Sequence, residues 1–431
     1  MMPTATPKPC PRSTGSAATP PPSVRLLVVS DVHFHTPLFQ QHQVNGGRSL
    51  TDSPSRLSTD IALGDPQNPF YALLRLVRDG KVKADVLVCC GDLTTCADPT
   101  AMNLGWLQLH RLADALKAGE PVVTAGNHDI DSRFKVSGTS PSRALKLLDP
   151  PFPSADSRAA ASYWSNGYCI LERKPYLRII LANTCALHGY STETDRQSDH
   201  GAFSEQLLHE IPTAIEAWRA PLNILLCHHH PREIDLPGED RSVARDGERL
   251  LATLERLGQP NWLVLHGHRH LPSVKYASSN ASSPIIFSAG SFAASLHLRI
   301  QGRTANQFYI IDIENTDAQL RGRFEAWTWS QHEAEWRRGE DTSALPASGG
   351  FGYRPYLAHA AQVIASLVPA RMDGTISWRD IETRAPDLRF LLIDDRSPLL
   401  DLLRANHGIE WESPNGRPMV GSGFLRLGRI R

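Results

Sequence analysis

The sequence lacks an excess of charge of either sign. Its 431 residues contain 45 Lys and Arg against 45 Asp and Glu, so the formal net charge is zero. A strongly basic chain would indicate a nucleic-acid or membrane partner, and this balance indicates neither. The balance of total charge does not exclude a local basic groove.

Long apolar runs are also missing. No stretch approaches the roughly 20 residues of a membrane-spanning helix, so we expect no membrane partner. The N-terminal segment has no apolar run that is typical of a secretory signal. The seven Cys include no Cys-x-x-Cys pair, and Cys89 and Cys90 are neighbours inside an apolar run, which indicates buried thiols rather than a disulfide. We therefore expect a cytoplasmic protein.

Composition divides the chain into three regions. Residues 1–23 are rich in Pro, Ser and Thr and cannot bury a core, so we expect a disordered leader. Residues 24–338 are predicted to form the main domain, in which residues 36–70 are a long polar insertion. Residues 339–431 are predicted to contain a linker and a small α-rich extension of unknown role, with helices over 356–367 and 397–408.

Short apolar runs alternate with helical patterns in the main domain. Their length and their content of branched residues are typical of buried strands, and Gly closes several of the helical patterns. Strands that alternate with helices indicate an α/β fold. The predicted strands lie in residues 24–30, 84–90, 121–125, 176–184, 221–227, 261–266, 284–290 and 307–313.

Polar segments directly follow five of these runs, at the carboxyl ends where α/β sheets bind their ligands. Each alone is a weak signal, because Gly-Asp usually marks a turn and an isolated His usually packs or faces solvent. Five together indicate one site. They are Asp31-Val32-His33, Gly91-Asp92, Gly126-Asn127-His128-Asp129, His228-His229-His230-Pro231 and His266-Gly267-His268-Arg269-His270.

The residue types in these segments suit two adjacent divalent cations. Carboxylate oxygens and imidazole nitrogens bind Mn, Fe, Zn, Co or Ni, and a shared carboxylate holds such ions about 3.5–4 Å apart. The spacing of Asp31 and His33, and of His268 and His270, would put each pair on one side of an extended segment. The sequence does not identify the metal.

In this order the motifs resemble those of the calcineurin-like metallophosphoesterase superfamily, over roughly residues 24 to 330. The resemblance implies a four-layer αββα sandwich, with two sheets packed together and helices outside. It implies that Asp31, His33 and His270 hold one ion. It implies that Asn127, His229 and His268 hold the other, that Asp92 bridges the two, and that His128 is the catalytic histidine.

Which of the three consecutive histidines is the ligand depends on the strand register. The family's ligand usually lies two residues before the proline, which selects His229, and alternation along a strand would turn His228 and His230 away. We expect Asp129 to fix its loop through backbone hydrogen bonds. His35 either supports the site, faces the substrate or is a bystander.

The expected reaction is hydrolysis of a phosphate ester by attack of a metal-bound hydroxide. The second motif, Gly-Asp-Leu-Thr-Thr, differs from the Gly-Asp-x-x-Asp-Arg-Gly of Ser/Thr protein phosphatases, so the resemblance is to phosphodiesterases that act on a nucleotide or another small phosphodiester. One alternative is a nuclease that works with a partner protein, which the neutral charge disfavours. Another is a non-catalytic binding or regulatory module, which the intact ligand set disfavours.

Overall fold

The computed structural model describes residues 22–37, 54–62, 64–132, 140–190, 200–234, 242–258, 261–296, 300, 302–316, 319–338, 344–369, 374–412 and 424–427. Nearly all of the predicted leader and residues 38–53 of the predicted insertion lie outside these ranges. Among the described residues, no helix is long and apolar enough to cross a membrane.

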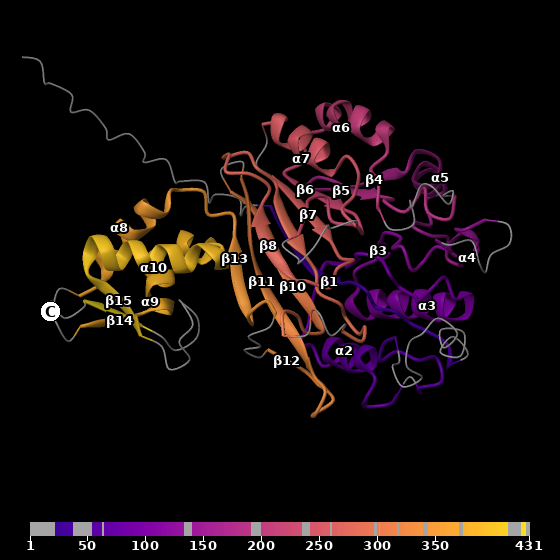
Figure 1. Ribbon diagram of the computed structural model, residues 1–431, viewed down its shortest axis with the longest axis horizontal. Coiled ribbons are helices and arrows are strands. Elements are labelled where there is room, and N and C mark those ends of the chain that lie inside the picture. The colour runs from indigo at the N-terminus through magenta and orange to yellow at the C-terminus, as the bar shows by residue number, and fades with distance from the viewer. Residues whose placement is uncertain are drawn as a thin grey trace, which may run out of the picture.

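The first sheet contains seven strands around a parallel centre. Strand β1 pairs in parallel with β2, which pairs in parallel with β3, and the remaining neighbours are antiparallel. The order is β12 (Glu335–Arg337), β11 (Gln319–Ser330), β10 (Gln307–Thr316), β1 (Ser23–Val29), β2 (Val86–Cys89) and β3 (Val122–Val123), with β13 (Ser348–Phe351) also on β11. Helices α2 (Pro69–Arg78) and α3 (Pro99–Leu116) cover its outer face (Figure 1).

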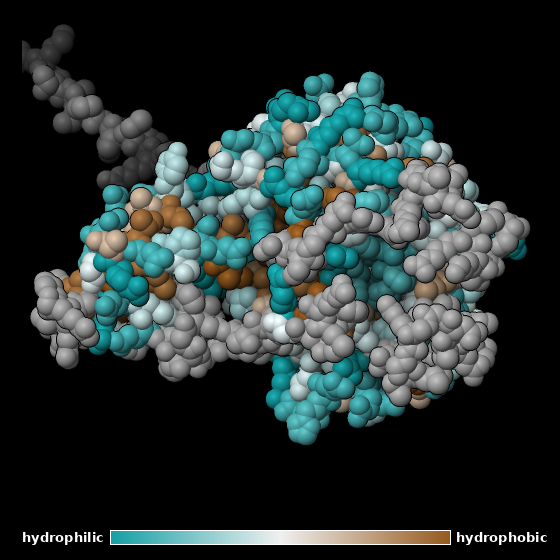
Figure 2. Space-filling model, in the orientation of Figure 1, coloured by the Kyte–Doolittle hydropathy of each residue, from teal (hydrophilic) through white to brown (hydrophobic). Residues whose placement is uncertain are grey.

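The second sheet contains six strands and is likewise mixed. Its order is β4 (Tyr168–Arg173), β5 (Leu177–Ala182), β6 (Leu222–Leu226), β7 (Trp262–His266), β9 (Ile285–Ser288) and β8 (Ser273–Tyr276). Helices α6 (Glu205–Ala217) and α7 (Gly247–Arg256) cover its outer face, and hydrophilic residues predominate on their exposed side (Figure 2). The short helix α4 (Arg143–Lys146) and helix α5 (Ser157–Asn166) precede β4.

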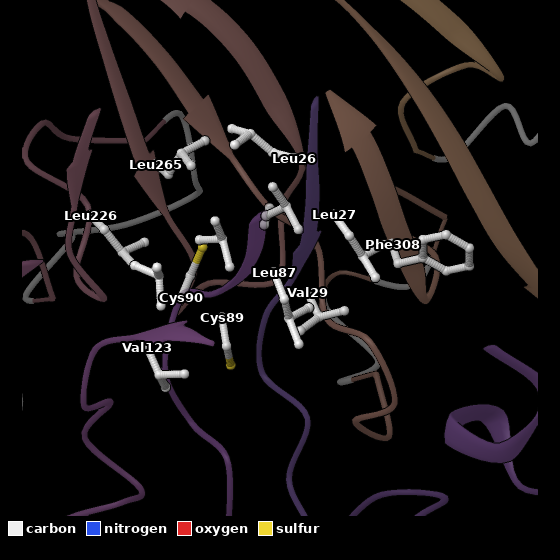
Figure 3. Close-up of a cluster of buried hydrophobic side chains, with 14 of the residues drawn as sticks. Leu26, Leu27, Val29, Leu87, Cys89, Cys90, Val123, Leu226, Leu265 and Phe308 are labelled. Atoms are coloured by element: carbon white, nitrogen blue, oxygen red, sulfur yellow. The ribbon is translucent and has the colours of Figure 1, made fainter. Parts of the chain in front are cut away.

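Alternation along the strands of the second sheet divides its side chains between two cores. In β6, Ile224 and Leu226 pack in the core between the sheets, while Leu225 packs beneath α6 and α7. Figure 3 shows Leu226 facing the same cluster as residues of the first sheet such as Leu26. The result is the expected four-layer αββα sandwich, in which burial of both sheet faces explains the nearly continuous apolar runs.

Polar caps fix the starts of the helices that flank the site. The side chains of Asn68 and Asp98 accept hydrogen bonds from the first backbone amides of α2 and α3. Each cap is followed by a proline at the first helical position, where its missing amide costs nothing. Both helices therefore begin where the local sequence dictates.

The C-terminal region folds around its own small core. It contains α8 (Leu357–Leu367), β14 (Thr375–Ser377), α9 (Trp378–Arg384), the 3-10 helix η2 (Pro386–Phe390), α10 (Ile393–His407), β15 (Ile409–Glu412) and β16 (Phe424–Leu427). The three strands form a separate antiparallel sheet in the order β14-β16-β15. This region, the C-terminal module, is the predicted α-rich extension, here with a sheet.

Candidate metal centre

The five predicted segments meet at one place because each follows a strand at the same edge of the sandwich. Asp31 and His33 follow β1, Asp92 follows β2, and Asn127 follows β3 in the first sheet. The histidines after β6 and β7 approach from the second sheet. Both sheets therefore contribute loops to the candidate site.

The backbone of these loops is not extended. Five site residues have a positive φ: Asp31 (51°), His33 (58°), Asp92 (53°), His268 (77°) and His270 (57°). Residues other than Gly rarely adopt a backbone conformation with positive φ, and those that do are concentrated at functional sites. The expectation that Asp31 and His33, and likewise His268 and His270, share a face of an extended segment is therefore wrong in its geometry, although all four residues lie at the candidate site.

Two glycines let these loops approach each other closely. A Cβ atom on Gly126 would collide with Asp92, and one on Gly267 would collide with Ser30 and Asp31. Since these neighbours are themselves buried site residues, no side chain larger than that of glycine fits at either position. The Gly-Asn-His-Asp and Gly-His-x-His motifs thus need their glycines for contact between loops.

Two groups of three potential ligands lie side by side. One contains Asp31, His33 and His270, and the other contains Asp92, His228 and His268; in each group the ligand atoms lie within 4.8 Å of one another. Nε2 of His270 is 3.2 Å from Oδ1 of Asp31. Oδ2 of Asp92 is 3.3 Å from Nε2 of His228 and 3.7 Å from Nε2 of His33, so this carboxylate lies between the groups.

Asn127 joins the second group through its amide oxygen. Oδ1 of Asn127 is 2.9 Å from Nδ1 of His268 and 3.0 Å from Nε2 of His228. The two imidazole nitrogens are only 3.2 Å apart. An oxygen and two nitrogens that converge so closely form a donor set for a divalent cation.

The structure groups His228, rather than the predicted His229, with other candidate ligands. Counting back from Pro231 selects that residue, but His228 is the one grouped with Asp92 and His268. Strand β6 ends at Leu226, and the histidines belong to the loop that follows, so the strand alternation that was expected to turn His228 away does not apply. His229 lies in a different group, with Cys185 and His188.

Backbone carbonyls and hydroxyl groups orient the candidate ligands. Nδ1 of His228 lies 2.8 Å from the carbonyl oxygen of Cys90, which can only accept, so Nδ1 donates and Nε2 keeps its lone pair when the ring is neutral. Oγ of Ser30 donates to Oδ2 of Asp31, and Oγ1 of Thr95 lies 3.3 Å from Nδ1 of His33. These supporting residues were not predicted from the sequence, where only the adjacency of Ser30 and Thr95 to the motifs could have suggested them.

Burial and mutual charge set the protonation of the site. Burial lowers the pKa of His33 to about 3 and lowers that of His268 well below its ordinary value. Asp92 is ionised, because His228 lowers the pKa of its carboxyl despite burial. Burial also opposes the charged form of His228, but Asp92 outweighs it and raises the pKa of His228 to about 9. The carboxylates lie beside the neutral imidazoles of His33 and His268, and this combination attracts a cation. In addition, Nε2 of His33 is buried with no hydrogen-bond partner.

His128 lies beside both groups. Its ring centroid is 5.0 Å from that of His33, and its backbone amide donates to Oδ1 of Asp92 at 2.7 Å. Burial lowers the pKa of His128, while Asp92 opposes this effect. The ring is part-buried, so it can exchange a proton with a bound molecule.

Neighbouring residues of the motifs have structural partners. Oδ1 and Oδ2 of Asp129 accept from the backbone amides of Thr94 and Gly126, each at 2.9 Å, which confirms its predicted loop-fixing role. His35 is buried, and its Nδ1 lies 3.1 Å from Oγ of Ser55, so it connects the first motif to the 36–70 insertion.

Comparison with known proteins gives two family matches. Residues 24–272 match the calcineurin-like phosphoesterases, and residues 349–405 match the family described as wHTH-Calcineurin_assc. No curated protein matches the chain at a significant level.

Several solved structures resemble the chain at low sequence identity. A structure of PhoD is 12% identical over 78% of this chain and 70% of that chain, with a TM-score of 0.41. The purple acid phosphatase PPD1 from yellow lupin (Lupinus luteus) seeds is 12% identical over 77% of this chain and 54% of that chain, with a TM-score of 0.42. The calcineurin-like phosphoesterase YfkN from Bacillus subtilis is 14% identical over 70% of this chain and 88% of that chain, with a TM-score of 0.33.

The first family match covers more than half of the chain and contains all five site loops. The buried Asp and His groups within it are those that the metal-dependent chemistry of the family requires. The chain therefore belongs to the calcineurin-like phosphoesterase family of metal-dependent hydrolases.

Proposed function

We propose that the protein is a two-metal phosphodiesterase that acts on a nucleotide or another small phosphodiester. Asp31, His33 and His270 would hold one cation. Asn127, His228 and His268 would hold the other, with Asp92 shared between them. The observation that carries this proposal is the position of Oδ2 of Asp92, within 3.7 Å of histidines from both groups.

The two cations would supply positive charge to the phosphoryl oxygens and lower the pKa of a water molecule. The protein's own residues set the geometry around them. Asp92 does so twice, since one oxygen faces the ligand groups while the other accepts from the amide of His128. His128 would then protonate the leaving oxygen or hold a phosphoryl oxygen as an imidazolium.

The preference for a diester is supported by the motifs. The sequence after Gly91 and Asp92 is Leu-Thr-Thr, and neither the Asp nor the Arg of the protein phosphatase motif is present. Thr94 and Thr95 instead turn inward: Oγ1 of Thr94 donates to the carbonyl of Phe34, and Thr95 contacts His33. This segment contains no arginine that could bind the additional negative charge of a phosphate monoester.

A nuclease is the second candidate, and the match of residues 349–405 is the observation that favours it. The order α8, β14, α9, α10, β15, β16 is that of a winged helix-turn-helix, in which the helix at the position of α10 enters a DNA groove. Here the first turn of α10 carries Asp394 and Asp395. These carboxylates would repel phosphates, so we rank the small diester first.

The test is hydrolysis of bis(p-nitrophenyl) phosphate against p-nitrophenyl phosphate, with Mn²⁺ and after EDTA. We expect a preference for the diester, loss of activity with EDTA, and a loss of about 100-fold or more in His128→Ala. His209→Ala, an exposed histidine on α6, is the matched control and should keep full activity. A preference for the monoester would overturn the diesterase assignment and keep the metal centre, and cleavage of single-stranded DNA alone would favour the nuclease.

A further inference from the structure

A third group of metal-ligating side chains lies beside the candidate metal centre. Cys185, His188 and His229 each place one ligand atom within 4.8 Å of the others, and all three residues are buried. Cys185 and His188 follow β5, whereas His229 follows β6, so two loops distant in sequence converge here. The ring of His229 is 4.4 Å from that of His268 and 5.1 Å from that of His228, centroid to centroid.

His229 has a nitrogen that its surroundings do not satisfy. Its Nδ1 lies 2.9 Å from Oγ1 of Thr184, while its Nε2 is buried with no hydrogen-bond partner. Either neutral tautomer leaves Nε2 unpaired, as a donor without an acceptor or as a lone pair without a donor, and an unpaired buried polar group is costly. A cation bound to the lone pair of Nε2 removes that cost, since Nδ1 can then donate to Thr184.

His188 shows a competition for one proton. Its Nε2 lies 2.9 Å from the carbonyl oxygen of His200, so Nε2 must donate and the neutral ring keeps its lone pair at Nδ1. Oγ of Ser132 is 3.0 Å from that Nδ1, 2.7 Å from the carbonyl oxygen of Asn127 and 3.3 Å from that of Ile130, and its hydroxyl has a single proton for the three acceptors. A cation at Nδ1 would leave the proton of Ser132 for the backbone carbonyls of Asn127 and Ile130. Protonation of His188 is the competing solution.

The sulfur of Cys185 completes the donor set. Its Sγ lies within 4.8 Å of a ligand nitrogen of each histidine and 3.5 Å from the carbonyl oxygen of Ala125. One thiolate and two imidazoles are three ligands of the kind that bind zinc, with a fourth position left for water. None of the seven ligands proposed for the neighbouring centre is a sulfur, so the two sites would differ in the metal that they prefer.

We propose that Cys185, His188 and His229 bind a third divalent cation, zinc, which holds the loop after β5 against the loop after β6. This inference is independent of the substrate and of the diesterase assignment. The ion would fix His229, whose ring packs on that of His268, and through Ser132 it would fix the loop of Asn127. It would thus stiffen the side of the neighbouring centre that the second sheet supplies.

The test is spectroscopic and reports the sulfur ligand alone. The full-length protein is produced in minimal medium with Co²⁺ in place of zinc, and its near-ultraviolet spectrum and metal content are measured without air. We expect a thiolate-to-cobalt charge-transfer band, because tetrahedral cobalt replaces zinc in such sites. The band should vanish in Cys185→Ser, with a loss of about one metal equivalent per chain.

Matched controls separate this site from the other thiols. Cys227→Ser removes a buried thiol that contacts the backbone of His229 but lies outside the ligand group, and it should keep the band. Cys96→Ser removes the thiol near His128 and should also keep it. If Cys185→Ser does not fold, His188→Gln tests the same site with Cys185 intact. This variant should weaken or shift the band. A wild-type protein that binds its metals without a charge-transfer band overturns the proposal. Protonation of His188 would then explain how its Nδ1 and the hydroxyl of Ser132 are paired.

Discussion

Nε2 of His228 lies 3.3 Å from Oδ2 of Asp92, while Nδ1 of the same ring donates to the carbonyl oxygen of Cys90 at 2.8 Å. The loop after β6 in the second sheet is thereby joined to the loop after β2 in the first. A single ring orientation thus sets both the contact between the sheets and the lone pair that faces the candidate metal centre.

This relationship distinguishes two neighbouring histidines. His228→Ala should remove about one metal equivalent per chain and lower activity by more than about 100-fold, because a direct ligand is lost. His229→Ala should have a smaller effect on activity, since His229 meets the candidate metal centre through ring contacts with His228 and His268 and not as a ligand. The diester assay compares the two variants, and elemental analysis measures the metal content of His228→Ala. If His229→Ala were the more damaging of the two, the corrected ligand assignment would be wrong.

Asp92→Ala should abolish metal-dependent hydrolysis with the fold retained. The substitution removes the shared carboxylate and also the acceptor for the amide of His128, so both metal retention and the placement of His128 suffer. Metal content, the diester assay and far-ultraviolet circular dichroism test the variant. Asp114→Ala, an exposed carboxyl on α3, is the control and should behave as wild type. Near-normal activity in Asp92→Ala would refute the proposed centre.

The metal-free protein should lose stability as the pH rises from about 7 to about 9. The pKa of His228 is raised to about 9 in the folded state, so the charged ring stabilises the fold below its unfolded pKa of about 6.5. That contribution, up to about 3 kcal/mol, is lost as the pH passes through the folded pKa. Thermal unfolding in EDTA across this range measures it. The slope should flatten in His228→Gln and in wild type with saturating Mn²⁺, and an unchanged slope in both would contradict the assignment to His228.

Asp129 should contribute to the stability of the fold rather than to catalysis. Its two oxygens accept from the amides of Thr94 and Gly126, and it is buried. Asp129→Ala leaves two buried amides unpaired, which should lower the free energy of unfolding by about 2–5 kcal/mol. Urea unfolding of the metal-loaded protein gives this value. A variant as stable as wild type would show that the loop finds other acceptors.

Much of the fold could be predicted from the sequence because both sheets are buried on both faces. Each of the eight predicted strands overlaps a strand of the structure, from β1 to β10. Strand β11 was missed, because its buried residues alternate with half-buried, mostly polar ones and its sequence, QLRGRFEAWTWS, has no continuous apolar run. Residues 348–351, in the segment predicted as a linker, pair with β11 for a similar reason, since Gly349 and Gly350 carry no strand signal.

The site could be predicted as a set of residues but not as a geometry. Six of the seven residues that the motifs predicted as ligands lie in the two groups of potential ligands or, for Asn127, in contact with one of them. The seventh depended on where β6 ends, and a count from Pro231 gave His229 in place of His228. The left-handed backbone at Asp31, Asp92 and His270 follows from contacts between distant loops, which local sequence does not encode. The group formed by Cys185 and His188 has no motif, and only the fold brings it to His229.

The C-terminal module should be held to the main domain by Tyr276 of β8. Its hydroxyl donates to the carbonyl of Tyr353 at 2.8 Å and accepts from the amide of Gly352 at 3.1 Å, and the guanidinium of Arg354 lies 4.3 Å from the ring centroid. Tyr276→Phe removes both hydrogen bonds but keeps the ring, at a cost of about 1–3 kcal/mol per group left unpaired.

Limited proteolysis measures this attachment. We expect faster cleavage near residues 339–355 in Tyr276→Phe, with the diester activity of the main domain unchanged, because Tyr276 lies outside the candidate metal centre. Tyr356→Phe, which alters a tyrosine that is 89% exposed, should be cleaved at the wild-type rate. Equal cleavage in all three proteins would mean that β13 and the contact of Arg321 with Asp387 suffice to hold the module. Loss of activity on release of the module would instead make it part of the catalytic unit.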